Sequence, residues 1–149
     1  MKLKLCIASA LLILAANTSA QAQILVTEEE AAAARAAPEP PVVKVVPVPN
    51  APKINLLAPD LTGPVSSPTR ILLKFEPTPP ASIRPESFKV RYGSMRLDIT
   101  GRITAVSKVG PEGIDVAEAA LPKGLHRLYL EVQDSMGRTG ERQLQFVVN

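Results

Sequence analysis

The chain has few of the side chains on which catalysis and metal binding most often depend. Its 149 residues include one Cys, one His and no Trp, and aromatic residues make up only 3% of the sequence. Disulfide frameworks and zinc sites need more Cys and His than this. The sequence also lacks the Gly-x-Ser-x-Gly pattern that presents a catalytic serine. We therefore expect no catalytic residues, no cofactor and no enzymatic activity.

Two groups of residues permit a metal-binding interpretation, but each also has a structural interpretation. His126 with Met136 or Met95 offers soft donors for a weak copper-type site, although such a site normally needs several donors. Asp134 lies in a glycine-containing loop, but no run of closely spaced acids accompanies it, as calcium requires. We expect His126 to be structural, Asp134 to accept hydrogen bonds within its turn, and no metal to be bound.

Residues 1–22 have the pattern of a secretory signal peptide. Lys2 and Lys4 precede an apolar stretch at 5–16, and residues 20–22 read Ala-Gln-Ala, a small-x-small cleavage sequence. This apolar stretch is shorter than the roughly 20 residues that a membrane-spanning helix needs. We expect cleavage after position 22, a periplasmic or secreted product, and no integral membrane segment in that product.

The formal net charge of +3 belongs partly to this leader. Without Lys2 and Lys4, 15 basic and 14 acidic residues remain, which is a net charge of +1. Residues 23–52 contain 2 basic and 4 acidic side chains, and residues 53–149 contain 13 and 10. A nearly neutral product does not have the electrostatic character of a nucleic-acid binder, so we expect no nucleic-acid partner.

Residues 23–52 predict a flexible arm that is rich in Ala and Glu and then in Pro. Thr27 and Glu30 have the spacing of a capping box at a helix start. The Ala-rich stretch after them offers no large apolar face, so we expect a frayed helix. Six prolines between positions 38 and 52 exclude a helix or a central strand. If it is extended, the stretch from 38 to 52 reaches roughly 45 Å at ~3.1 Å per residue.

A short valine-rich stretch within the arm permits a second interpretation. Its residues are β-prone and would add as a strand to the edge of a partner sheet. A solvated spacer is the simpler interpretation, because prolines on both sides limit the stretch to a few residues. The candidate docking residues are Val42, Val43, Val45 and Val46.

Residues 53–149 show the alternation of apolar and polar residues that is typical of β-strands. The clearest runs are 70–75, 88–92, 127–132 and 143–148. Weaker candidates are 54–57, 95–99, 103–106 and 114–121. Seven or eight short strands in one domain are the spacing expected of an all-β, two-sheet sandwich.

Several stretches of this region resemble a bacterial immunoglobulin-like domain of exported proteins. They include residues 83–93, Leu-Pro-Lys-Gly-Leu-His at 121–126 and Asp-Ser-Met-Gly-Arg at 134–138. The resemblance covers about residues 52–149. It implies an immunoglobulin-like β-sandwich in which the 121–126 motif leads into a buried strand and the 134–138 motif closes the last hairpin. It says little about function, because such sandwiches serve adhesion, spacing, sugar binding and partner docking alike.

Four basic residues fall around one predicted pair of strands: Lys89, Arg91, Arg96 and Arg102. Outward positions of a strand must be polar in any case, so a solvated face explains them most simply. Their functional interpretation is a face that binds an anion or a partner, such as lipid head groups or an envelope polysaccharide. A sugar site usually relies on aromatic platforms, and the chain has only two Tyr and three Phe.

We therefore expect an exported, non-catalytic module for protein interaction or spacing, with an envelope or extracellular protein as its partner. The alternative is a binding module for an envelope glycan or another anionic ligand.

Overall fold

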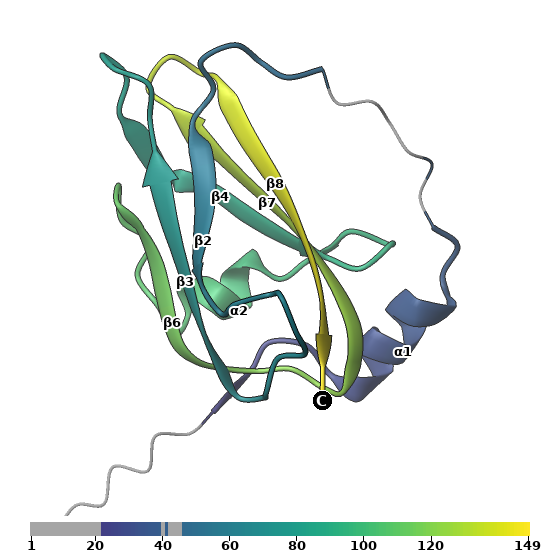
Figure 1. Cartoon of the computed structure of the whole chain (residues 1–149). Helices are drawn as coiled ribbons and strands as arrows, with labels where there is room; N and C mark the ends of the chain where they lie inside the picture. The colour runs from purple at the N-terminus through teal and green to yellow at the C-terminus, as the bar shows by residue number, and fades with distance from the viewer. Residues whose placement is uncertain (1–21, 40, 42–45) are drawn as a thin grey trace, which may run out of the picture.

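The computed structural model of the chain describes residues 22–39, 41 and 46–149. Most of the predicted signal peptide lies outside these residues, as do Val42, Val43 and Val45. The described chain forms two four-stranded sheets packed face to face (Figure 1). The predicted all-β sandwich is thereby confirmed, with eight strands and two short helices among the described residues.

Each sheet combines strands from distant parts of the sequence. The first sheet contains, in spatial order, β1 (Gln23–Ile24), β6 (Gly113–Ala120), β3 (Thr69–Glu76) and β2 (Lys53–Ala58). The second contains β5 (Leu97–Asp98), β4 (Ile83–Tyr92), β7 (Gly124–Asp134) and β8 (Thr139–Val148). The helices are α1 (Glu28–Ala36) and α2 (Thr100–Thr104). Neighbouring strands are antiparallel except for β1, which runs parallel to β6.

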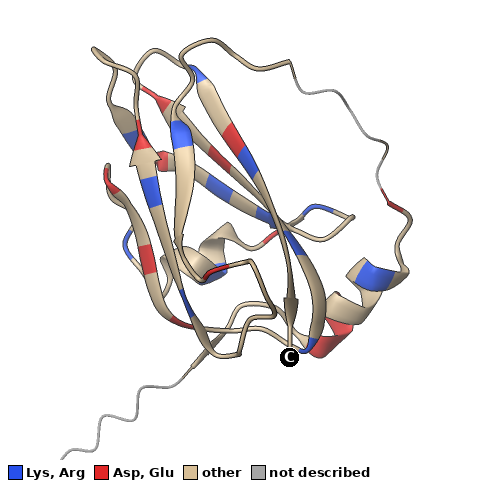
Figure 2. Cartoon of the chain, in the orientation of Figure 1, with Lys and Arg blue, Asp and Glu red and all other residues tan. Residues whose placement is uncertain are grey.

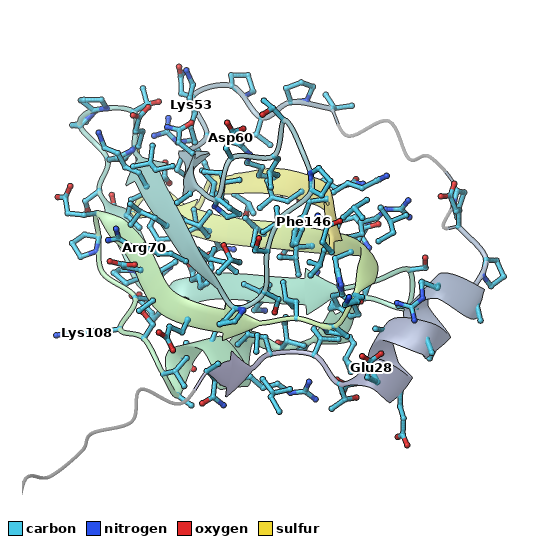
Figure 3. All side chains as sticks on the ribbon, turned by 60° about the horizontal axis from the view of Figure 1, so that its bottom comes forward. Glu28, Lys53, Asp60, Arg70, Lys108 and Phe146 are labelled. Carbon is cyan, nitrogen blue, oxygen red and sulfur yellow. The ribbon has the colours of Figure 1, made fainter. Side chains whose placement is uncertain are left out.

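Alternation along each long strand determines which side chains form the core. On β7, Leu128, Leu130 and Val132 are buried between the sheets. Phe146 of β8 also lies between the layers, whereas Arg70 of β3 lies at the periphery (Figure 3). The buried residues of both sheets form one continuous hydrophobic cluster.

The four strands predicted from the clearest alternation are present as parts of β3, β4, β7 and β8. The weaker predictions at 54–57 and 114–121 are also confirmed, as β2 and β6. The segment 95–99 contributes only the two residues of β5. Period-two alternation was therefore a sufficient signal wherever a strand has one buried face.

The strand predicted at 103–106 is wrong, because α2 extends to Thr104 and the next two residues continue as a turn. The Asp98 carboxylate accepts a hydrogen bond from the Thr100 amide at 2.8 Å, which turns the chain at the helix start. Ile99 and Ile103 lie one helical turn apart, and both are buried. Two apolar residues at this spacing are too few to distinguish a helical turn from a short strand in the sequence.

The prediction of a flexible arm is wrong for residues 23–37, which we call the N-terminal segment. β1 pairs with Ala119 and Ala120 of β6, and the Leu25 amide donates to the Ala120 carbonyl at 3.1 Å. Leu25 and Val26 are each only 1% exposed and belong to the core cluster. The N-terminal segment therefore packs with the sandwich, and the folded unit begins well before residue 53.

Helix α1 begins at the predicted capping box. The Glu30 amide donates to Thr27 Oγ1 at 3.2 Å, and the Glu30 carboxylate accepts from the Thr27 amide at 2.9 Å. Its small side chains do bury a face, contrary to expectation: Ala31 is fully buried, and Ala34 contacts the turn at Gly93. A Cβ on Gly93 would lie 2.6 Å from the Ala34 Cβ, so glycine permits this close approach.

Candidate functional site

Three residues of the predicted basic face, Lys89, Arg91 and Arg96, lie on the outer side of the second sheet. Arg91 of β4 forms an ion pair with Glu131 of β7, and Lys89 lies opposite the same glutamate in the strand register. The Arg96 guanidinium lies 3.5 Å from the centroid of the Tyr129 ring. Basic and acidic residues are interspersed over the described strands (Figure 2), as on an ordinary solvated face.

The fourth predicted residue, Arg102 of α2, holds the N-terminal segment. Its guanidinium forms two hydrogen bonds with the Glu30 carboxylate, at 2.6 and 2.7 Å, and one with the Leu25 carbonyl at 2.9 Å. The hydrogen bonds from Arg102 lower the pKa of Glu30 to about 2. Arg102 is thus engaged in the fold, and its charge is already neutralised by a partner that the sequence did not reveal.

A different arginine lies in a surface hollow of about 250 Å³, which we call the Arg127 hollow. It is formed by the end of α1, the segment after α1, the turn after β4 and the start of β7. Its main lining residues are Ala34, Arg35, Glu39, Gly93, Leu125 and Arg127. The hollow therefore combines two basic side chains and one acidic side chain with a largely apolar wall.

Arg127 projects from the outer face of β7, directly opposite Gln145 of β8. Its side chain is only 16% exposed, and its Nη2 donates to Glu39 Oε1 at 2.9 Å. The Gln145 side-chain oxygen accepts longer bonds from Nε and Nη2, at 3.4 and 3.3 Å. The hydrogen bond to Glu39 raises the pKa of Arg127 above its ordinary value. Glu39 itself is 81% exposed, so a well-covered cation faces an open carboxylate.

Tyr92 and His126 form a polar pair in the core beside this hollow. His126 Nε2 donates to the Pro122 carbonyl at 2.6 Å, so its Nδ1 accepts the Tyr92 hydroxyl at 2.9 Å. Burial lowers the pKa of His126 and raises that of Tyr92, which keeps both rings neutral at pH 7. The imidazole also stacks on Phe146 with ring centroids 5.8 Å apart. The structural role predicted for His126 agrees with these contacts.

The soft-metal arrangement considered for His126 does not form. His126 begins β7, whereas Met136 follows its end, and a strand of this length separates them by roughly 30 Å. Both imidazole nitrogens are already hydrogen-bonded. Among residues 22–39, 41 and 46–149, no group of three or more His, Cys, Asp or Glu side chains is placed to hold a metal ion.

Asp134 has the turn role predicted from its loop. Its carboxylate accepts hydrogen bonds from the amides of Met136 and Arg138, both at 3.0 Å, and from Arg138 Nε at 2.7 Å. Burial alone would raise the pKa of Asp134, but these hydrogen bonds outweigh it and leave the pKa below its ordinary value. The carboxylate is therefore committed to the β7–β8 turn.

A second, larger hollow of about 510 Å³ lies where the edge strands β2 and β8 begin, and we call it the β2–β8 groove. One wall is the end of the proline-rich segment, where Val46 is 81% exposed and Val48 is 50% exposed. The Arg142 guanidinium crosses from β8 to the Ile54 carbonyl of β2 at 2.8 Å. The groove therefore has an apolar rim and a charged floor.

The proline-rich segment is attached to the sandwich at both of its ends. At its start, Glu39 pairs with Arg127. At its end, Pro52 lies against Gly140 of β8 so closely that a Cβ on that glycine would be 1.9 Å from the Pro52 carbonyl oxygen. Within the part of the chain that the structure describes, both flanks of the proline-rich segment therefore contact the sandwich, so these flanks are not a free arm.

The sequence did not indicate Arg35, Glu39 or Arg127 as site residues. Arg127 and Glu39 are 88 residues apart, and each is an isolated charge in its own segment. The only usable signal was the outward position of Arg127 on a predicted strand, which it shares with every polar strand residue.

No helix in the described part of the chain has the length and apolar character needed to cross a membrane. Comparison with family models, curated proteins and solved structures finds no significant match to this chain. The immunoglobulin-like identity implied by the sequence resemblance therefore stays a prediction.

Proposed function

We propose that this protein is an exported, non-catalytic protein-interaction module that offers its proline-rich segment to an envelope or extracellular partner. The observation that carries the proposal is the exposure of Val46 and Val48 beside the point where Pro52 packs against Gly140 of β8. Covering exposed apolar side chains with a partner surface is favourable, because it removes them from water. The packing of Pro52 restricts the end of the segment and so reduces the conformational entropy that it loses on binding.

The β2–β8 groove supports the same assignment. It lies beside the two valines and between β2 and β8, which are the edge strands of their sheets in the described part of the chain; Val65 bridges β8 only at its far end, at Val148. An extended segment of a partner protein fits such a place, because it contacts apolar side chains and forms backbone hydrogen bonds at an edge. We therefore infer that the partner presents an extended, apolar-faced peptide segment.

Glycan binding, the main alternative, finds little support in the aromatic residues. Sugar-binding faces present exposed rings, but both Tyr and all three Phe of this chain are buried. Tyr129, the only one on an outer strand face, lies beneath Arg96. Protein interaction is accordingly the function that we favour.

The test is crosslinking in the native envelope followed by identification of the captured protein. The variant carries Val46→Ser and Val48→Ser, which remove the exposed apolar contacts without changing a buried residue. We expect capture of the partner to fall by at least about tenfold, because each lost apolar contact is worth ~1 kcal/mol or more.

The matched control carries Met95→Ser and Val106→Ser, two exposed apolar residues that do not line the β2–β8 groove. This control is expected to capture the partner as the unaltered protein does. A passive spacer would behave differently: both double variants would capture equally well, and that result would refute the proposal.

A further inference from the structure

The Arg127 hollow has the features of a receptor for a carboxylate, and these features do not depend on the proline-rich interaction proposed above. Arg127 is held on a central strand of the second sheet, between β4 and β8, with its side chain mostly covered. Gln145 and Glu39 fix the direction of its guanidinium. A preorganised and partly desolvated guanidinium is the group that proteins use most often to bind carboxylates.

The present occupant, Glu39, is easily exchanged. Its carboxylate is 81% exposed and forms one hydrogen bond of 2.9 Å with Arg127. Ion pairs with so open a partner contribute little to stability, because water screens them and the long side chain must be ordered. A carboxylate that is better covered on binding would therefore compete well with Glu39.

A second arginine, Arg35, also lines the hollow. Arg35 belongs to α1, and its Nη1 donates a single long bond of 3.3 Å to the Lys123 carbonyl. Among the described residues Arg35 forms no ion pair, so its charge adds to the attraction for an anion. Two arginines from different elements thus line the hollow, and Glu39 is its only acidic lining residue among those that the structure describes.

Size and lining define the class of ligand. The volume of about 250 Å³ is below the ~300–1,000 Å³ of pockets for drug-sized ligands, so the hollow admits one or two side chains. Ala34, Gly93 and Leu125 provide small or apolar surfaces next to the guanidiniums. The internal occupant is itself a glutamate, which stands between Pro38 and Pro40 in the sequence.

We propose that the Arg127 hollow binds a glutamate or aspartate side chain of an extended acidic peptide in a partner protein, and that Glu39 occupies the hollow as an internal ligand in the free protein. Arg127 makes the principal contact, and Arg35 adds a second cation at the rim. Binding exchanges one carboxylate for another, so it also releases the start of the proline-rich segment from β7.

The experiment measures fluorescence anisotropy of a labelled peptide, Ala-Ala-Pro-Glu-Pro-Pro, which copies the chain around Glu39. Glu39→Gln removes the charge of the internal competitor, and we expect it to tighten peptide binding roughly two- to fivefold, the effect of one exposed ion pair. Arg127→Gln in the Glu39→Gln background should lower affinity at least about tenfold. Arg35→Gln should lower it less, by roughly threefold, since Arg35 lies at the rim.

Two controls make the result specific. Arg70→Gln removes another arginine that pairs with a carboxylate, Asp115 on the first sheet, and it should leave peptide affinity unchanged. The same peptide with Gln in place of Glu should not bind. Melting temperatures of all variants identify any that fail to fold, and the gain from Glu39→Gln with the loss from Arg35→Gln tests the site even if Arg127→Gln is unfolded.

Several results would overturn the proposal. Peptide binding that is no tighter in Glu39→Gln would show that Glu39 is not a competitor. Equal losses of peptide affinity in Arg70→Gln and Arg127→Gln would show that the peptide is attracted by the overall positive charge and not by the Arg127 hollow. Displacement of the peptide by an equal concentration of inorganic phosphate would assign the hollow to small anions instead of acidic peptides.

Discussion

Gly93 and Gly137 both have positive φ, at 66° and 78°, but only Gly93 contacts another element. A Cβ at Gly93 meets Ala34 of α1 at 2.6 Å, whereas a Cβ at Gly137 meets nothing within 4 Å. Each substitution by Ala should lower the free energy of unfolding by ~1–2 kcal/mol, because a residue with a Cβ disfavours the left-handed backbone conformation. Gly93→Ala should lower the free energy of unfolding by a further ~1–3 kcal/mol, because α1 must move to relieve the overlap with Ala34.

Urea unfolding of the two variants measures this difference directly. Since Gly137→Ala contains the backbone effect alone, subtracting its loss isolates the contact between the β4 turn and α1. Equal losses in both variants would mean that α1 does not pack against Gly93 in solution.

The second residue-scale prediction concerns Glu30 and acid. The pKa of Glu30 is about 2 in the folded protein, against 4.5 for the unperturbed group. The unfolded chain therefore binds the proton more tightly, so the contribution of Glu30 to stability is complete above about pH 4.5 and is lost as the pH falls toward 2. Allowing for solvent screening of the partly exposed pair, we expect this contribution to be about 1–2 kcal/mol.

The measurement is the free energy of unfolding of the unaltered protein and Glu30→Gln between pH 2 and 7. The gap between them should be widest near neutral pH and should narrow on acidification, because protonated Glu30 resembles Gln. Glu118→Gln, at an exposed position of β6, serves as the control and should show no such gap. A gap that is constant with pH would contradict the assigned Glu30–Arg102 interaction.

Local chemistry made some of these residues predictable. The capping box of Thr27 and Glu30 and the turn role of Asp134 depend on neighbours three or four positions away, so the spacing alone revealed them. The partner of Arg102 lies 72 residues earlier in the chain, and no local pattern contains that information. Lone charges are thus the residues whose roles depend most on the complete fold.

At the scale of elements, β1 provides a test of how firmly the N-terminal segment is held. Leu25 is 1% exposed and lines the core, whereas its neighbour Ile24 is 62% exposed. Leu25→Ala should lower the free energy of unfolding by ~2–5 kcal/mol through lost burial and the cavity left behind. Ile24→Ala should change it by no more than ~0.5 kcal/mol.

Chemical denaturation of this adjacent pair separates burial from any general effect of the sequence change. Both residues belong to the same turn of chain, and both changes remove an aliphatic side chain. Similar values for the two variants would show that the N-terminal segment is detached from the core in solution.

Strands could be predicted where one face of the strand is buried. The prediction failed where packing against the rest of the fold determines the local structure. β3, β4, β7 and β8 show regular alternation over most of their length. The N-terminal segment has only two consecutive apolar residues at the buried position, Leu25 and Val26, followed by small alanines. Such a segment is stabilised by packing against the sandwich and not by its own helix propensity. Its composition alone therefore predicted a flexible arm.

At the scale of the molecule, the two-sheet architecture followed from the number and spacing of the strands, whereas the extent of the folded unit did not. The candidate site depends on that extent, because Arg35 and Glu39 belong to a part of the chain assigned to the arm. Once α1 lies beside the start of β7, these residues meet Arg127. The alternation of apolar and polar residues therefore located the sandwich, whereas three of the four residues of the predicted basic face contact internal partners.

The last prediction compares a chain that begins at Gln23 with one that begins at Pro38. The shorter chain lacks Leu25 and Val26, and each buried aliphatic side chain contributes ~1.5–3 kcal/mol. Their loss, about 3–6 kcal/mol, is comparable with the 5–15 kcal/mol of a typical domain. We therefore expect a much lower melting temperature and increased binding of the dye ANS, since core residues such as Ile99 and Ile103 lose their cover.

The second part of this experiment adds a synthetic peptide of residues 23–37 to the shorter chain. This peptide contains the pairing edge of β1, the two buried apolar residues and the Glu30 partner of Arg102. Added in excess, it should reduce ANS fluorescence of the shorter chain, and the same peptide with Leu25→Ala should do so much less. A shorter chain that melts within a few degrees of the longer one would contradict the conclusion that the N-terminal segment completes the core.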